Sequence, residues 1–205
     1  MMLQKKSSPG SHLRTSGPTK SMSISAVLSA AHSLINSVPF QNRTDYVHPT
    51  SFITIDEEGF PSARLVVSLE VAPDFSKIIL STRTNTRKVA EIKASLDRKG
   101  VTVSASGAVP ENTGVPASCS WNDYRNRGGW LTIKGLASLG KQIEDGTKIE
   151  IIFRPVHLEI MSYSEKVHED ADGWSPVILS REGENQWKRG HPVPKCVRNA
   201  TSGHT

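Results

Sequence analysis

The sequence predicts a mainly β domain with flanking helices (α+β), in which short antiparallel strands form a closed or nearly closed barrel. Two observations predict this fold class. The hydrophobic pattern changes from a period near 3.6 residues to a period of 2 after residue 47. Several strand-like segments then follow one another, with a single helix-like segment inserted among them. A parallel sheet would instead alternate strands and helices regularly, so an antiparallel barrel fits better.

The chain begins with a segment that is too polar to fold alone. Residues 1–22 are rich in Ser, Pro, Gly and Lys, which predicts a disordered basic tail. Residues 23–38 place apolar side chains on one helical stripe, with Ser23 as a candidate N-cap and Pro39 as the stop. We expect one domain over residues 23–180. Residues 181–205 are expected to form a C-terminal tail, partly docked through Trp187.

A β-hairpin is predicted next. Residues 52–56 and 62–70 are strand-like, and the turn sequence D-E-E-G-F-P lies between them. Alternation on the second strand puts two sets of side chains on opposite faces. One face carries Ala63, Leu65, Val67 and Leu69, and the other carries Arg64, Val66, Ser68 and Glu70.

The remaining strands are predicted from short apolar or β-branched runs. They cover residues 77–82, 101–106, 130–137, 147–153, 157–163 and 176–179. Residues 108–129 are predicted to form a long loop. Because such loops are often functional, and because this one carries Trp121, Tyr124, Arg125 and Arg127, we interpret it as a functional or interface segment.

Charge does not favour a nucleic-acid partner, although the 205-residue chain has a formal net charge of +5. All five excess charges lie before residue 45, where no acidic residue occurs, and the rest of the chain holds 20 basic and 20 acidic residues. The basic residues of this segment are Lys5, Lys6, Arg14, Lys20 and Arg43. No aromatic residue is interleaved with them before Phe40, so a stacking platform for single strands is missing.

Cysteine and histidine spacing gives no metal site. Cys119 and Cys196 stand far apart and are predicted to be free thiols in a reducing compartment. The seven histidines form no H-x-H or H-x-x-x-H pair. No apolar run is long enough for a membrane span. We therefore expect a cytoplasmic protein without a membrane partner; an organelle address in the Ser-rich, acid-free N-terminal tail is the alternative.

The strongest functional signal is the segment 81–88, S-T-R-T-N-T-R-K, between a strand-like and a helix-like run. Asn85 or Thr86 can cap the helix, which places Arg87 and Lys88 in its first turn. Cations usually avoid that positive end of the helix dipole, whereas anions bind there. The pattern predicts an anion site. The alternative is a solvated turn in which Arg87 and Lys88 pair with Glu91.

Three motifs in this order resemble the FMN-binding split-barrel family typified by pyridoxamine 5'-phosphate oxidase. They are the strand R-L-V-V from Arg64 after a D-x-x-G-x-P turn, the run I-I-L-S-T-R-T-N-T-R-K-V-A, and W-L-T-I-K-G from Trp130; a P-x-x-L-E run from Pro155 follows. The resemblance covers residues 52–158. It implies an antiparallel split β-barrel of the Greek-key type, and a homodimer with FMN bound at the subunit interface.

The resemblance also implies cofactor contacts. Arg64, Arg87 and Lys88 would hold the FMN phosphate, with hydroxyl donors beside them, since guanidinium and hydroxyl groups suit a phosphate dianion. The backbone of residues 65–67 would lie along the isoalloxazine ring, and Trp130 would cover the ring by stacking. The implied cofactor-binding residues are Arg64, Leu65, Val66, Val67, Ser81, Thr82, Thr86, Arg87, Lys88 and Trp130.

The departures from the family pattern concern the substrate. Leu69 stands where a basic substrate contact is expected, and Gly129 and Trp130 replace an Arg-Gln pair. Only residues 139–146 separate two strands, which leaves no room for the helical insertion that grips a vitamin B6 substrate, and Met161 replaces a tryptophan. We therefore expect an FMN-dependent oxidoreductase acting on another small molecule, with no catalytic residue assigned. The alternatives are a non-catalytic FMN or haem sensor of the same fold and an OB-like barrel that binds RNA.

Overall fold

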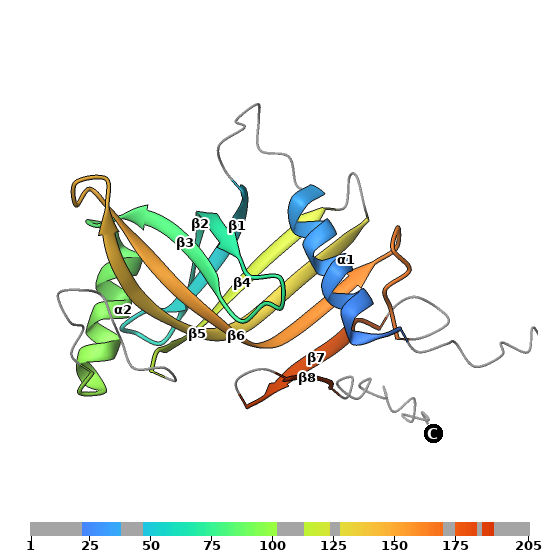
Figure 1. Ribbon diagram of the computed structural model, residues 1–205. Helices are drawn as coiled ribbons and strands as arrows, with labels where there is room; N and C mark the ends of the chain where they lie inside the picture. The colour runs from blue at the N-terminus through green and yellow to red at the C-terminus, as the bar shows by residue number, and fades with distance from the viewer. Residues whose placement is uncertain are drawn as a thin grey trace, which may run out of the picture.

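The computed structural model describes residues 22–37, 47–101, 113–123, 128–169, 175–183 and 186–190. In these residues, antiparallel strands form one sheet in the order β3-β2-β1-β4-β5-β6-β7-β8, and an additional β3–β6 pairing closes the first six into a barrel (Figure 1). The strands are β1 (Val47–Ile55), β2 (Pro61–Val71), β3 (Ile78–Arg83), β4 (Val115–Asp123), β5 (Gly129–Ile143), β6 (Lys148–Ser162), β7 (Val177–Glu182) and β8 (Gln186–Arg189). The predicted antiparallel split barrel with flanking helices is confirmed.

The helices lie at opposite ends of the long β5–β6 pair (Figure 1). α1 (Ile24–Ser37) packs against β4, β5 and β6, and the side-chain oxygen of Ser23 accepts a hydrogen bond from the Ala26 backbone at 3.3 Å, as an N-cap does. α2 (Arg87–Arg98) follows β3 directly and buries Val89, Ile92 and Leu96. Both predicted helices are therefore confirmed, and α2 brings Arg87 and Lys88 to one end of the barrel.

β6 corrects one prediction. The segments 147–153 and 157–163, expected to be two strands, form a single strand whose first half pairs with β3 and whose second half pairs with β7. The register shifts between the Lys134–His157 and Gly135–Pro155 pairs, so Val156 is the extra residue, next to the proline that cannot donate a ladder hydrogen bond. The partner strand has Gly135 there, where a Cβ atom would lie 2.1 Å from the carbonyl oxygen of Arg154. A bulge thus bends the strand without ending it.

A second prediction, that of a long loop over residues 108–129, is wrong where β4 forms. Residues 115–123 lie inside the stretch predicted to be a long loop, yet they form a strand between β1 and β5. Val115, Cys119, Trp121 and Asp123 are buried, while Pro116 and Asn122 are exposed. Serines and proline mask this alternation in the sequence, and pairing on both sides decides the conformation. Residues 108–112 and 124–127 of the expected loop, and residues 102–106 of the candidate strand 101–106, lie outside the described residues.

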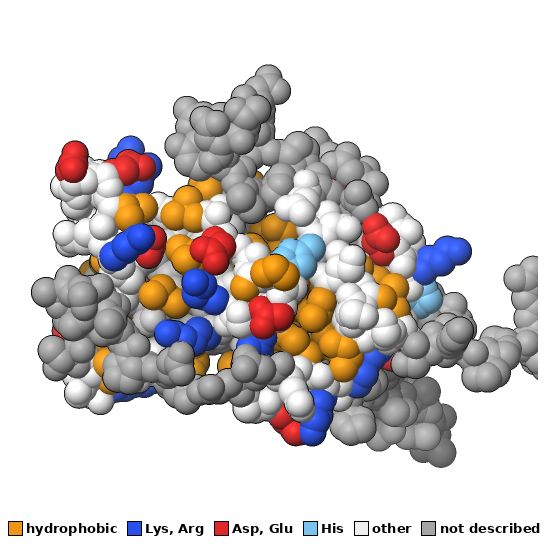
Figure 2. Space-filling view, viewed as in Figure 1, with side chains coloured by type: hydrophobic (Ala, Val, Ile, Leu, Met, Phe, Trp, Pro, Cys, Tyr) orange, Lys and Arg blue, Asp and Glu red, His pale blue; other side chains and the backbone are white. Residues whose placement is uncertain are grey.

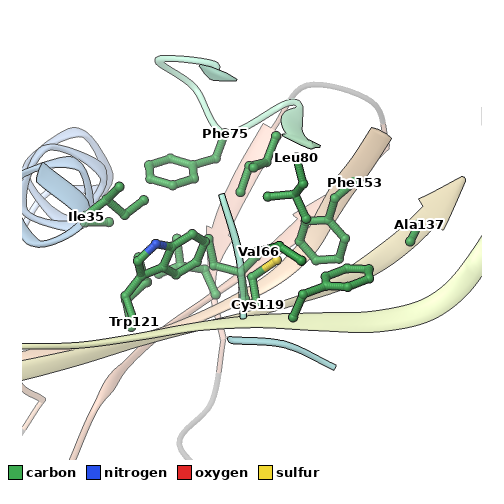
Figure 3. Close-up of a cluster of buried hydrophobic side chains, with 14 of the residues drawn as sticks. Ile35, Val66, Phe75, Leu80, Cys119, Trp121, Ala137 and Phe153 are labelled. Atoms are coloured by element: carbon green, nitrogen blue, oxygen red, sulfur yellow. The ribbon is translucent and has the colours of Figure 1, made fainter. Parts of the chain in front are cut away.

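The core fills the barrel and continues under α1. Phe52 of β1 and Phe153 of β6 meet edge to face, with ring centroids 6.3 Å apart. In Figure 3, Ile35 of α1, Phe75 of the β2–β3 connection and Trp121 of β4 converge from three elements. Cys119 is a free, fully buried thiol, as predicted, and burial raises its pKa. Cys196 lies outside the described residues.

The C-terminal hairpin docks on the connection between β2 and β3. Trp187 of β8 is buried, and its indole N–H donates to the Asp74 carbonyl oxygen at 2.7 Å. Arg181 of β7 donates to the same oxygen at 3.0 Å and lies 4.7 Å from the centre of the Trp187 ring. These contacts hold the connection between β2 and β3 in place. β2 and β3 are the two strands that carry most of the predicted site.

Candidate functional site

Lys88 is the centre of the candidate site. It lies in the first turn of α2, its side chain is only 7% exposed, and Nζ donates to the Thr82 hydroxyl at 2.8 Å. Burial lowers the pKa of Lys88, repulsion from Arg64 lowers it further, and Glu91 opposes both. Among the described residues, no carboxylate forms an ion pair with this ammonium group. A buried cation with a neutral partner is costly unless an anion joins it.

Arg64 supplies a second cation to the same place. It lies on β2 opposite Phe52, whose side chain is buried inside the barrel, so Arg64 belongs to the inward face of the sheet. Its own side chain is nevertheless exposed to solvent. One guanidinium nitrogen donates to the Ala63 carbonyl oxygen at 2.7 Å. β2 pairs with β3 here, with Val67 opposite Ser81, so Arg64 lies on the strand next to the one whose Thr82 bonds Lys88. Arg64 and Lys88 are therefore the two cations of the candidate anion site, which we call the seat.

Arg87 is differently placed. Its Nε lies 3.0 Å from Oε1 of Glu91, and its Nη2 lies 3.7 Å from Asp56 and 3.9 Å from Glu58. The alternative interpretation of a solvated, acid-paired turn therefore describes Arg87, but not Lys88. Glu91 is buried, and its other oxygen accepts the Thr54 hydroxyl at 2.7 Å. The contribution of Asp56 and Glu58 was not predicted, because the turn that carries them is 28 or more residues away in sequence.

Two of the three predicted hydroxyls reach the seat. The Thr82 and Thr86 hydroxyl oxygens are 3.5 Å apart, and Thr82 is bonded to Lys88. Thr86 is the N-cap residue by position, but its hydroxyl donates to the Arg83 carbonyl oxygen at 3.1 Å, so the helix N–H groups receive no side-chain cap. Ser81 pairs with Val67 and follows the strand alternation to the opposite face from Thr82.

β2 presents two different faces to a ligand. Val66 is buried, whereas Leu65 is 66% exposed on the opposite, outward face, which Val67 and Ser81 share. The predicted ring-facing residues therefore lie beside the anion seat, one strand position from Arg64. Outward apolar side chains continue onto β1, where Ile53 and Ile55 pair with Ala63 and Pro61.

Trp130 is not brought to this seat within one chain. It pairs with Asn122 and Met161 near the start of β5, beside the end of the barrel that α1 covers. Thr82 pairs with Ile149, which in turn pairs with Gln142 of β5. The two places are thus at opposite ends of β5, and the path along the strand between them is roughly 40 Å at about 3.3 Å per residue. The strand pairing of one chain therefore does not bring Trp130 next to Lys88.

A second polar cluster lies away from the seat, across β5, β6 and β7. Oε1 of Glu159 accepts hydrogen bonds from Lys134 at 2.8 Å and lies 2.9 Å from Nε2 of His157, whose Nδ1 is 3.2 Å from the Ser180 hydroxyl. Burial alone would raise the pKa of Glu159, but the bonds from Lys134 and His157 hold it below its ordinary value. Its members satisfy one another, so we interpret it as a cross-strand ladder.

Three features of the described residues bear on other classes of partner: surface charge, metal ligation and membrane-spanning helices. On the face in Figure 2, basic and acidic side chains are interspersed, with apolar side chains between them. In the residues that the structure covers, no group of three or more His, Cys, Asp or Glu side chains could hold a metal ion. No helix there is long and apolar enough to cross a membrane.

Comparison with solved structures defines the class of the fold. A Clostridium acetobutylicum protein related to general stress protein 26 of B. subtilis (pyridoxinephosphate oxidase family) is similar to 76% of this chain over 95% of its own, with a TM-score of 0.50 and 14% identity. PhzG from Burkholderia lata 383, solved with tetrahydrophenazine-1-carboxylic acid, matches 86% of this chain and 99% of its own length. Its TM-score is 0.50 and its sequence identity is 13%. A pyridoxamine 5'-phosphate oxidase-related, FMN-binding protein from Nostoc punctiforme matches 80% of this chain and 94% of its own length. Its TM-score is 0.50 and its sequence identity is 11%.

These similarities show that the chain has the split-barrel fold of the pyridoxamine 5'-phosphate oxidase type. At such low identity they establish the fold alone. No protein-family model matches the sequence, and no curated protein matches it. The choice of ligand therefore depends on the residues of the seat.

Proposed function

We propose that this protein is an FMN-binding flavoprotein whose cofactor phosphate occupies the seat formed by Arg64 and Lys88. The observation that carries the proposal is the buried ammonium group of Lys88, which has a hydroxyl partner but no ion-paired carboxylate among the described residues. A phosphate monoester carries up to two negative charges near neutral pH and accepts several charge-assisted hydrogen bonds. Thr82 and Thr86 add hydroxyl groups, and the FMN-binding protein from Nostoc punctiforme has the same fold.

The proposed activity is that of an oxidoreductase on a small molecule. Bound FMN would supply hydride transfer, and the protein would supply placement and exclusion of water. Lys88 and Arg64 would bind the phosphate, and the backbone of Leu65 and Val67 would orient the ring along β2. A non-catalytic FMN or haem sensor is the second candidate, because Leu69, where a basic substrate contact is expected, is an exposed apolar residue. A cytoplasmic location belongs to the same proposal.

The test is the visible spectrum of the purified protein, with the bound chromophore released and identified. We expect the two flavin absorption bands and release of FMN, or stoichiometric binding when FMN is added to the colourless protein. A haem spectrum would favour the sensor, and a colourless protein that does not bind added FMN would contradict the flavin proposal. Reduction of the bound flavin by candidate donors, followed by reoxidation, then separates an oxidoreductase from a carrier.

We further propose a homodimer with the cofactor at the subunit interface. Two features support it. The outward face of β2 and β1 exposes Leu65, Leu69 and Ile55, an apolar surface of the kind that marks interaction sites. The strand pairing of one chain does not bring Trp130 to the seat, so we propose that the partner provides it.

Replacing Leu65 with aspartate is expected to break this dimer, because a charge would be buried without a partner at the interface. Size-exclusion chromatography with light scattering should then report the monomer mass at micromolar concentration. Ala90→Asp is the matched control, since it adds the same charge at an exposed position of α2 and should leave the dimer mass unchanged. A monomeric wild-type protein would refute the dimer.

A further inference from the structure

Arg87 is engaged by carboxylates on both sides of the candidate site. Nε faces Glu91 from the same helix, and Nη2 faces Asp56 and Glu58 from the turn between β1 and β2. Asp56 is fixed in that turn, because its Oδ1 accepts the Phe60 backbone N–H at 2.8 Å. In the ligand-free protein, the guanidinium that a phosphate would recruit is therefore already paired.

The three contacts differ in strength. Glu91 is 6% exposed, and its Oε1 lies 3.0 Å from Nε as an ion pair without hydrogen-bond geometry. Its Oε2 is held by Thr54. The contacts to Asp56 and Glu58, at 3.7 and 3.9 Å, are longer than hydrogen bonds, and the side chain of Glu58 is 66% exposed. The Asp56 side chain is only 13% exposed, but that of Arg87 is 61% exposed, so water reaches both contacts from the Arg87 side. Solvent-exposed ion pairs contribute little and are readily exchanged. The two turn carboxylates can be displaced, while Glu91 stays.

The charges of the site match such an exchange. With Arg64, Arg87 and Lys88 facing Asp56, Glu58 and Glu91, the cations and carboxylates are equal in number. Release of Asp56 and Glu58 leaves an excess of two positive charges, which equals the charge of a fully ionised phosphate monoester. A ligand that lacks the phosphate has no reason to recruit Arg87, so its affinity does not depend on the turn.

We propose that Asp56 and Glu58 compete with the ligand phosphate for Arg87, and thereby determine how strongly the site discriminates FMN from riboflavin. The proposal rests on FMN as the ligand. The two carboxylates weaken the binding of the phosphorylated flavin only, so their removal widens the difference between the two flavins. Glu58 is the cleaner residue to change, because Asp56 also holds the turn.

The experiment measures dissociation constants for FMN and riboflavin in the wild type, Glu58→Gln and Glu57→Gln. Glu57 is the matched control, since it is exposed in the same turn and carries the same charge, but no ion pair with Arg87 is seen. We expect Glu58→Gln to tighten FMN binding about two- to fivefold and to leave riboflavin unchanged. Glu57→Gln should have a smaller effect, and the effect of Glu58→Gln should disappear in an Arg87→Ala background.

Equal effects of Glu58→Gln and Glu57→Gln, or an effect that persists without Arg87, would overturn the competition while leaving FMN binding intact. If the wild type does not bind FMN, the proposed function fails instead. Inorganic phosphate then serves as the probe, with the guanidinium nitrogen resonances of Arg87 followed by NMR. If the carboxylates compete with phosphate, those resonances shift at a lower phosphate concentration in Glu58→Gln than in Glu57→Gln. Shifts at the same phosphate concentration in both variants would contradict the competition.

Discussion

Replacing Lys88 with methionine is expected to weaken FMN binding by about 1.5–3 kcal/mol, which is roughly 10- to 150-fold in the dissociation constant. Methionine keeps most of the buried aliphatic volume and removes the charge that would meet the phosphate. Isothermal titration with FMN measures the effect. Riboflavin, which has no phosphate, should bind both proteins alike. Lys93→Met is the matched control, because Lys93 is an exposed lysine of the same helix.

The same substitution should act in the opposite direction on the ligand-free protein. Burial lowers the pKa of Lys88 below its ordinary value of 10.5, so the folded state disfavours the charged form relative to the unfolded chain. This cost is present below the folded pKa and disappears as the pH rises through it toward 10.5. Lys88→Met should therefore leave unfolding stability at pH 7 unchanged or raise it. A loss of both stability and FMN affinity would indicate a merely structural lysine.

The FMN affinity of the wild type should fall on both sides of neutral pH. The second ionisation of a phosphate monoester lies near pH 6, so a dianion is lost below about that value. At high pH, Lys88 loses its proton, and earlier than an ordinary lysine would. In Lys88→Met the alkaline decline should be absent, while the acidic one persists.

Replacing Phe153 with alanine is expected to lower the free energy of unfolding by about 3–5 kcal/mol, through lost burial and a residual cavity. Phe153 is fully buried in the middle of β6 and packs edge to face on Phe52. Small domains have only about 5–15 kcal/mol of stability in total, so the variant would be marginal. Urea unfolding measures the change, and an unchanged denaturant slope would show that the unfolded reference is the same.

The control for Phe153 is Val156→Ala on the same strand. Val156 is exposed, so its truncation should change stability by less than about 0.5 kcal/mol. Equal effects at the two positions would mean that the barrel interior does not depend on the Phe52–Phe153 contact. Because Phe153 pairs with Ile78 of β3, the same strand that carries Thr82, loss of FMN binding in Phe153→Ala is expected to accompany unfolding and not to precede it.

Local pattern was sufficient wherever one element determined the outcome. Period-2 alternation predicted β2, and the apolar stripes predicted α1 and α2 with their start positions. The polar run was also correctly placed between a strand and a helix, here β3 and α2, because a strand end followed directly by a helix start fixes its own geometry. The sequence failed at β4, whose serines resemble a loop, and at β6, where proline resembles a break. Pairing with distant strands outweighs local propensity at both places.

The sequence by itself determined the fold class, the position of the basic turn and the identity of its cations. Only the tertiary structure decided which of those cations is available. Lys88 lies buried beside Thr82, whereas Arg87 is held by Asp56 and Glu58 from another turn, and Trp130 lies at the far end of the barrel. The reason is physical: a charge acts over a few ångströms of space, and barrel closure places residues from distant parts of the chain within that range.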